Sequence, residues 1–188
     1  YNYSEERNTF LELSKRIISQ LEKEFRWVYE TNHYENNAIA KDKGRINYTV
    51  WSDVFACSHC SNEFVYWDVA VGKDSKVKTD FSCPHCNVSL TRRTIEKLWV
   101  TEYDQMTGQH TKQPKQVPVL ISYDYRGKRY EKCPDEDDLS LVQRILDMDI
   151  NDWVPVFRIP DGEKTKELHR QGITTTDKFY TKRTLLVL

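Results

Sequence analysis

Cys57-Ser-His-Cys60 and Cys83-Pro-His-Cys86 are two Cys-x-x-Cys pairs, separated by the 22 residues from 61 to 82. Each pair places two sulfurs on one tight turn, and four thiolates from two such turns satisfy the tetrahedral coordination of zinc. The interval slightly exceeds the usual spacing of roughly 15 to 20 residues. The pattern predicts a zinc ribbon in which a β-hairpin brings the second turn back to the first. Reduced or redox-active cysteines are the alternative.

The predicted metal is structural Zn²⁺. Four protein thiolates fill the coordination sphere and leave no position for a catalytic water. His59 and His85 lie inside the two turns but are not needed as ligands, so we expect both on the surface. Cys133 is the odd thiol among the five cysteines, and we expect it to be a small buried residue.

The composition predicts a folded, soluble chain with one core and a smaller lobe stabilised by the metal. Of its 188 residues, 38% are hydrophobic and 30% are charged, and no apolar run approaches the roughly 18 residues that a membrane span needs. We therefore expect no membrane partner. A net charge of −1 argues against a generally basic nucleic-acid binder, so any polyanion site is expected to be a local patch. Thiols paired as metal ligands suit a reducing compartment, which predicts a cytoplasmic location.

Apolar periodicity predicts two helices. Ser4 is a candidate N-cap for the first helix. The apolar residues that follow recur every three or four positions, as an amphipathic helix requires: Phe10, Leu13, Ile17, Leu21, Phe25 and Val28. Pro134 and the acidic residues 135–138 suit the first turn of the second helix. Its expected buried stripe is Leu139, Val142, Ile145, Leu146 and Met148.

Alternating apolar and polar residues predict strands at 45–55, 117–125 and 128–132, the last two joined at Arg126-Gly127. Three further segments are expected as a loop (32–44), a short helix running into a strand (94–103) and a turn (106–109). The ribbon hairpin is expected to have arms at 64–69 and 77–81 and its turn at 72–75. The fold class is therefore α+β. Its expected parts are a helical segment and loop (1–45), the zinc ribbon (46–91) and a mixed region of β-hairpins and helix (92–188).

Motifs of the common catalytic sites do not occur in the sequence. It has no Gly-x-Ser-x-Gly elbow and no P-loop, and its six glycines never form Gly-x-Gly. An enzyme of unfamiliar type stays open. Basic residues cluster within 76–78, 92–97, 112–115 and 126–132. Phosphate contacts need such clusters, although ordinary solvated surface explains them equally well.

Longer stretches carry a resemblance to a known family. They are Gly44-Arg-Ile-Asn-Tyr-Thr-Val-Trp-Ser-Asp-Val-Phe-Ala-Cys57, Trp67-Asp-Val-Ala-Val71, Lys115-Gln-Val-Pro-Val-Leu-Ile-Ser-Tyr123, Lys128-Arg-Tyr-Glu-Lys132, and Gly172-Ile-Thr with Phe179-Tyr-Thr-Lys-Arg-Thr-Leu-Leu-Val-Leu188. Together with Cys83-Pro-His-Cys86 they resemble the zinc-ribbon target-recognition insertion of bacterial site-specific DNA methyltransferases of the N4-cytosine/N6-adenine class. The resemblance spans most of the chain.

The resemblance implies a DNA-binding, target-recognition region that serves an S-adenosylmethionine-dependent methyltransferase. Its implied partners are double-stranded DNA and the catalytic domain of the same polypeptide. The Phe-x-Gly-x-Gly and Asp/Asn/Ser-Pro-Pro-Tyr motifs of that family do not occur here, so no catalytic residue is carried over. S-adenosylmethionine belongs to the parent protein, and the chain alone is expected to be inactive. The residues expected to contact DNA are Arg92, Arg93, Arg126, Lys128 and Arg129.

The chain is also expected to be part of a longer protein. It begins at Tyr1 and ends on the apolar run Thr184-Leu-Leu-Val-Leu188, which resembles the point where the insertion returns to the catalytic core. A second function stays open beside the first, namely a zinc-stabilised scaffold that binds a partner protein or forms a dimer. Its interface would use tryptophans: Trp51, Trp67, Trp99 and Trp153.

Overall fold

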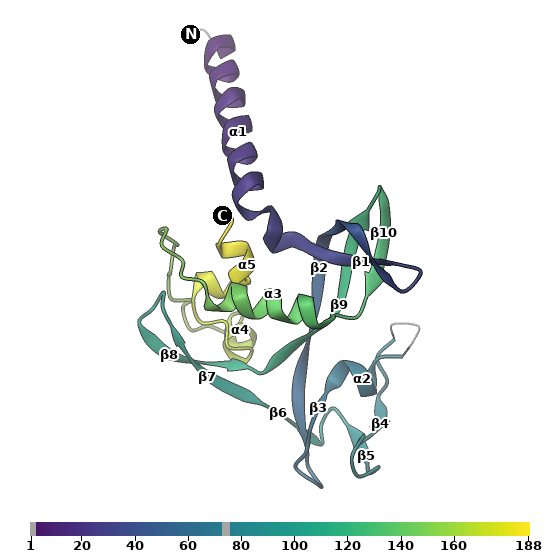
Figure 1. Ribbon diagram of the computed structural model, residues 1–188. Coiled ribbons are helices and arrows are strands. Elements are labelled where there is room, and N and C mark those ends of the chain that lie inside the picture. The colour runs from purple at the N-terminus through teal and green to yellow at the C-terminus, as the bar shows by residue number, and fades with distance from the viewer. Residues whose placement is uncertain (1–2, 73–75) are drawn as a thin grey trace.

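One long strand organises this protein. The computed structural model describes residues 3–72 and 76–188, with side chains from residue 6 onward; the Ser4 side chain and the predicted turn residues 73–75 lie outside that description. Strand β2 (Ala38–Cys57) pairs along its first part with β1 (Glu30–Glu35) and β9 (Gln116–Tyr125), and β10 (Lys128–Lys132) extends this antiparallel sheet. The end of β2 pairs with β3 (Glu63–Val65) and β6 (Ile95–Lys97). The same strand therefore serves both the sheet and the cysteine region, and the α+β class is confirmed (Figure 1).

The segment 32–44, expected as a loop, is instead most of a hairpin. β1 and β2 pair on either side of Asn36 and Asn37, whose φ angles are 51° and 64°. A two-residue hairpin turn of type I′ needs positive φ at both positions, and asparagine tolerates this conformation. The turn between β9 and β10 is built in the same way from Arg126 and Gly127, with φ of 47° and 75°. That second hairpin was predicted, because glycine is the stronger signal.

The expected ribbon hairpin with arms at 64–69 and 77–81 does not form. β3 pairs with β2, and β4 (Asp80–Ser82) pairs with β5 (Ser89–Thr91), so each cysteine turn closes a hairpin of its own. Between them, residues 66–70 form the short helix α2 (Tyr66–Ala70), and one bridge joins Val71 to Val77. Ser52 Oγ accepts a hydrogen bond from Trp67 N at 3.0 Å, which stabilises the first turn of this helix against β2.

The region after β5 is extended throughout its first part. The short helix expected within 94–103 is absent: residues 95–97 form β6, and the chain continues as β7 (Trp99–Asp104). β7 pairs with β8 (Gln109–Pro114), and the predicted turn at 106–109 is confirmed, with Gly108 at φ 67°. Trp99 and Val100 are half-buried at the start of β7, whereas Tyr103 near its end is exposed.

The first helix is present, but its apolar face is uncovered. Helix α1 (Tyr3–Phe25) projects away from the sheet in Figure 1 and continues into the 3-10 turn η1 (Arg26–Tyr29). Val28 is fully buried, whereas Phe10 is 68% exposed and Ile17 is 55% exposed. The periodicity therefore predicted the helix correctly, while burial is confined to its end at the sheet.

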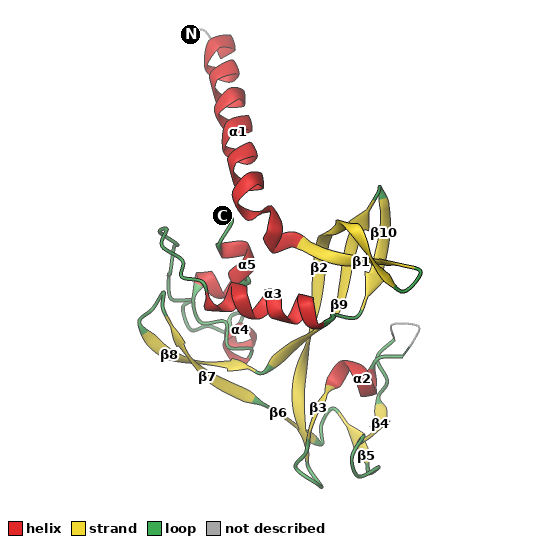
Figure 2. Ribbon diagram, in the orientation of Figure 1, coloured by secondary structure: helices red, strands yellow, loops and turns green. Residues whose placement is uncertain are grey.

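The second helix, α3 (Glu136–Asp147), begins at an acidic capping box. Asp135 is the N-cap and accepts from Asp138 N at 2.9 Å, and Asp138 accepts from Asp135 N at 3.0 Å. The expected buried stripe is only partly correct, since Ile145 is buried but Leu139 and Leu146 are each 47% exposed. The helix contacts β1 and the short C-terminal helix α5 (Lys182–Leu185), as Figure 2 shows in outline.

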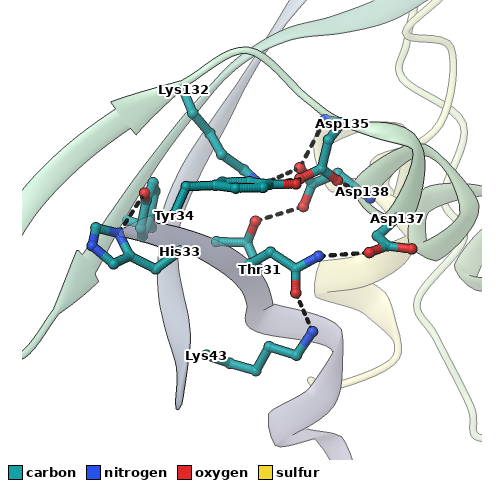
Figure 3. A network of polar contacts seen from close by, with 10 residues as sticks. Thr31, His33, Tyr34, Lys43, Lys132, Asp135, Asp137 and Asp138 are labelled. Atoms are coloured by element: carbon teal, nitrogen blue, oxygen red, sulfur yellow. Dashed lines mark hydrogen bonds and ion pairs between the residues drawn. The ribbon is translucent and has the colours of Figure 1, made fainter. Parts of the chain in front are cut away.

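Polar side chains, rather than a large apolar surface, join α3 to the sheet (Figure 3). Thr31 on β1 donates to Asp138 Oδ1 at 2.5 Å, and Tyr34 donates its hydroxyl hydrogen to Asp135 Oδ2 at 2.8 Å. Lys132, at the end of β10, reaches both carboxylates. This network fixes the first turn of α3 against the sheet edge.

Two apolar cores lie along β2. One surrounds the cysteines and contains Phe55, Phe64, Phe81 and Leu90, and the other lies under the sheet around Ile46, Ile121, Tyr123 and Tyr125. The chain finishes with α4 (Lys166–Arg170), η2 (Thr176–Phe179) and α5. Within residues 3–72 and 76–188, no helix has the length and apolar character needed to cross a bilayer.

Candidate metal centre

The four cysteines are presented by two equivalent hairpin turns. Cys57 ends β2 and Cys60 precedes β3, while Cys83 and Cys86 lie between β4 and β5. In the first turn the N–H of residue 61 donates to Cys57 O at 2.9 Å, and in the second the N–H of residue 87 donates to Cys83 O at 3.0 Å. Both donors have left-handed backbone, with φ of 58° and 61°. The repeated geometry aims each pair of sulfurs at one point.

The sulfur positions fit a tetrahedral zinc ion. All four Sγ atoms lie within 4.8 Å of one another, and the Cys57–Cys86 and Cys60–Cys83 sulfur pairs are each 3.8 Å apart. A zinc–sulfur bond of about 2.3 Å gives tetrahedral edges of about 3.8 Å. A disulfide would bring two sulfurs to about 2.05 Å, and all four cysteines are free. The geometry therefore agrees with a closed four-thiolate site.

Backbone groups favour thiolates at this centre. His59 N lies 3.4 Å from Cys57 Sγ, and His85 N lies 3.4 Å from Cys83 Sγ. The N–H groups of Cys60 and His59 lower the pKa of the Cys57 thiol to about 6, against the opposing effect of burial. The N–H of Val88 acts in the same direction on Cys86, but burial and the hydrogen bonds to the other thiols outweigh it and raise that pKa to about 12. Four sulfurs this close need a cation to ionise together.

The residues around the four cysteines shield part of the site from solvent. Cys57 and Cys83 are buried against the phenylalanine core, and Cys60 and Cys86 are half-buried. His59 and His85 are exposed, as expected. Cys133 is exposed as well, which corrects the expectation that it would be buried. It follows the last residue of β10, where neither strand pairing nor the α3 helix covers it.

The structure does not bring the five predicted DNA-contacting residues together. Arg92 and Arg93 lie on the turn between β5 and β6, close to the metal centre, whereas the remaining three lie at the β9–β10 turn, at the other end of the sheet in Figure 1. Those three are Arg126, Lys128 and Arg129.

The five predicted DNA-contacting residues differ in the charge of their neighbours. Arg126 is 3.4 Å from Glu35 and 3.3 Å from Asp42, and Arg129 is 3.6 Å from Asp124. Arg92 and Lys128 are exposed, and no carboxylate in the part of the chain that the structure describes lies within ion-pairing distance of either. The same holds for Arg93. These three cations are the ones available to an incoming phosphate without displacing a carboxylate.

Sequence patterns did not single out one further cation, Arg183. Its guanidinium reaches Thr49 across 134 residues of sequence separation, and no local spacing signals such a contact.

The chemistry that the cysteine centre itself supports is structural, because the four cysteine sulfurs would fill every position around a bound zinc ion. No protein-family model, curated protein or solved structure matches this chain.

Proposed function

We propose that this chain is the zinc-stabilised target-recognition region of an S-adenosylmethionine-dependent DNA methyltransferase of the adenine-N6 or cytosine-N4 class. The observation that supports it most is the arrangement of the stretches that resemble that family. Residues 44–57, 116–123 and 128–132 belong to β2, β9 and β10, which are neighbours in one sheet, and β2 ends at the first predicted zinc ligand. Segments far apart in the sequence thus form one connected unit.

In this proposal zinc has no catalytic role. It cross-links the two cysteine turns, so that the exposed residues Arg92 and Arg93 are held on a rigid turn beside α2. Arg92 is additionally placed over the Tyr66 ring, with 5.7 Å between Cζ and the ring centroid. Lys128 supplies a cation at the β9–β10 turn. Methyl transfer to an extruded base is the work of the catalytic domain of the same polypeptide, which binds the S-adenosylmethionine.

Arg126 and Arg129 contribute to DNA binding only by exchanging a carboxylate for a phosphate. Their ion pairs are exposed, and exposed pairs are worth about 0 to 1 kcal/mol. A DNA phosphate therefore competes with Glu35 and Asp124 at low cost. We expect smaller losses of DNA affinity from substitutions at these two arginines than at Arg92, Arg93 or Lys128.

The direct test is binding of the zinc-loaded chain to duplex DNA, followed by fluorescence anisotropy over a series of salt concentrations. Each phosphate contact contributes about −0.9 to the slope of log K against log salt, so the expected slope is clearly negative. Absence of binding at low salt, or affinity that does not respond to salt, contradicts the proposal. A methyl-transfer assay on this chain alone is expected to show no turnover.

Charge reversal locates the binding face. The Arg92→Glu, Arg93→Glu double variant should lose most of the DNA affinity, and the Arg126→Glu, Arg129→Glu double variant should lose less. The Arg158→Glu, Arg170→Glu double variant is the matched control, because both are exposed arginines that pair with a carboxylate, Asp161 and Glu167 respectively. Equal losses in all three variants would indicate a general charge effect with no defined face.

A second candidate function is a zinc-stabilised scaffold for protein contact or dimerisation. It is favoured by the uncovered face of α1, where five large apolar residues are 42% to 68% exposed: Phe10, Leu11, Leu13, Ile17 and Ile18. Soluble monomers seldom leave a contiguous apolar surface of this kind without a function. Of the tryptophans expected at such an interface, Trp153 is exposed and the other three are half-buried.

Sedimentation velocity separates the two candidates. If α1 mediates self-association, the wild-type chain should sediment as a dimer at micromolar concentration and Ile17→Glu should sediment as a monomer. Loss of assembly with unchanged DNA affinity in Ile17→Glu assigns the two functions to different surfaces. A wild-type monomer at all concentrations removes dimerisation as the role of α1.

A further inference from the structure

A cavity of about 330 Å³ lies between β2, α3 and α5. Its apolar wall comes largely from α3, including Val142 and Ile145, while its polar wall combines Asn47 and Thr49 of β2 with Lys182 and Arg183 of α5. None of the aspartates and glutamates that the structure describes lines it. The volume is at the lower end of the range for small-molecule sites, about 300 to 1,000 Å³.

Arg183 lines this cavity, and its described contacts are with uncharged groups. Its Nη1 donates to Thr49 Oγ1 at 3.3 Å, and its Cζ lies 5.7 Å from the centroid of the Tyr29 ring. Among the residues that the structure places, no carboxylate lies within the 4.0 Å of an ion pair with it. Burial lowers the pKa of its guanidinium. A desolvated arginine normally has a paired anion, and its five N–H donors exceed what Thr49 can accept.

The carboxylate whose charge acts on Arg183 from a distance is Asp138, and its oxygens are already occupied. Asp138 Oδ1 accepts from Thr31 at 2.5 Å, while Oδ2 is 2.7 Å from Lys132 Nζ and accepts from Asp135 N (Figure 3). Asp138 therefore completes the network at the start of α3. It leaves the positive charge in the cavity unneutralised.

We propose that this cavity binds a phosphate group, with the Arg183 guanidinium as its principal contact. Guanidinium groups bind phosphate oxygens through two parallel hydrogen bonds. Lys182 adds a second positive charge to the lining, although its Nζ also donates to Leu146 O at 2.6 Å and so fixes α5 against α3. Thr49 and Asn47 supply neutral polar groups on the same polar wall. Two cations and no acid match the charge of a phosphate better than that of a single carboxylate.

The phosphate has two possible sources with the same chemistry, the DNA backbone or a small phosphorylated compound. Tyr29, Tyr48 and Trp51 also line the cavity, so an aromatic surface is available to whatever the phosphate is attached to. The site itself does not depend on the DNA-binding function proposed above, because it follows from the unpaired charge and the cavity.

Titration with inorganic phosphate tests the site, with chloride at the same ionic strength as the reference. The wild-type chain should bind phosphate saturably, and its backbone amide NMR signals should shift around residues 47–49 and 181–184. Arg183→Gln should weaken phosphate binding at least tenfold, and Arg183→Lys should weaken it less. Arg158→Gln is the matched control, since Arg158 is an exposed arginine outside the cavity that pairs with Asp161.

Three results would overturn the proposal: no difference between phosphate and chloride, NMR shifts confined to other surfaces, or unchanged phosphate affinity in Arg183→Gln. If Arg183→Gln does not fold, the NMR map of the wild-type chain and the Thr49→Val variant decide the question, the latter through a several-fold loss of affinity. Zinc content and circular dichroism establish that each variant is folded.

A second experiment identifies the molecule that carries the phosphate. If the phosphate belongs to DNA, a duplex displaces inorganic phosphate, and Arg183→Gln reduces the salt slope of DNA binding by about one contact. If it belongs to a small compound, a nucleoside monophosphate binds more tightly than inorganic phosphate, and Arg183→Gln leaves DNA affinity unchanged. Both results support the site. Failure of the wild-type chain to bind DNA removes the proposed function but leaves the phosphate titration intact.

Discussion

The Lys132 ammonium lies 2.7 Å from Asp138 Oδ2 and 2.6 Å from Asp135 Oδ2, so one cation at the end of β10 pairs with two carboxylates in the cap of α3. The Asp138 side chain is 4% exposed and that of Lys132 is 12% exposed. Burial of charge at this level is stable only when partners satisfy it. Lys132 therefore supplies the positive charge in the polar network that joins the sheet to α3.

Lys132→Met should lower the free energy of unfolding by about 3 to 5 kcal/mol, because it leaves a buried carboxylate without its cation. Urea unfolding of the zinc-loaded chain measures this loss. Lys128→Met is the control on the same strand, since Lys128 is exposed, and it should change the free energy of unfolding by less than about 0.5 kcal/mol. Equal losses in the two variants would show that the ion pairs of Lys132 contribute little.

Asp135 should make the stability of the chain depend on acid pH. Burial alone would raise the pKa of its carboxyl group, but the Lys132 ammonium, the Asp138 N–H and the Tyr34 hydroxyl outweigh burial and hold that pKa well below its ordinary range. A carboxyl group with a depressed pKa in the folded state contributes stability that is present above its unfolded pKa of about 3.9. That contribution is lost as the pH falls below about 5 toward the folded value.

The matched variant is Asp135→Asn, because asparagine retains the N-cap hydrogen bond without the charge. Wild type should lose free energy of unfolding more steeply than Asp135→Asn below about pH 5, and the curves should run parallel near neutral pH. Wild type and Asp135→Asn both keep the four cysteines. Acid release of zinc therefore affects both alike and cancels in the difference between their free energies of unfolding. Parallel curves throughout the acid range would contradict the assigned role of Asp135.

The sequence predicted correctly those elements whose signals lie within a short stretch of the chain. The Arg126-Gly127 turn, the strands on either side of it and the acidic start of α3 are all specified within about ten residues, and all are present. The cysteine cluster belongs to the same class, since the spacing of Cys57, Cys60, Cys83 and Cys86 alone predicted their convergence. Metal ligation converts a local spacing into a tertiary contact.

The errors have two causes. The hairpin at Asn36 and Asn37 was missed although its strands are adjacent in sequence, because its turn carries no glycine, whereas other errors depend on tertiary contacts that no local pattern shows. Residues 66–70 alternate as a strand would, but they form α2. The pairing of β3 with β2 ends at Val65, and Trp67 N then donates to the Ser52 side chain on β2. Arg183 likewise gains its significance only from Thr49 and Tyr29, which no periodicity connects to it.

Gly44 permits a close approach between β2 and the tyrosine core. A Cβ atom at this position would lie 2.9 Å from Tyr123 Cε2 and closer still to Cδ2, so an alanine has to displace a ring that is itself buried between strands. Gly44→Ala should lower the free energy of unfolding by about 1 to 3 kcal/mol, as overpacked core positions do. Gly162→Ala is the control, because its added Cβ would meet Thr165 Oγ1 at 3.4 Å, an ordinary contact. If urea unfolding finds both variants equally stable, the Tyr123 ring moves freely.

Zinc binding should be stoichiometric and should depend on the four clustered cysteines alone. Atomic absorption of the purified chain is expected to find one zinc ion, and cobalt substitution should produce the intense absorption of a tetrahedral thiolate site. Cys83→Ser should lose the metal, because Cys83 is fully buried and the weaker hydroxyl ligand cannot replace its thiolate. Cys133→Ser should retain one zinc ion, since Cys133 is exposed and outside the cluster.

Removal of the metal should unfold the cysteine region before the sheet. The core there is small and each of its hairpins has only three paired residues per strand, so zinc ligation supplies much of its folding free energy. After chelation, limited proteolysis should cut within 58–92 while β9 and β10 stay protected, and a wild-type sample with zinc restored should regain resistance. Unchanged protection of 58–92 in the chelated chain would mean that apolar packing around Phe55, Phe64 and Phe81 holds this region without a metal.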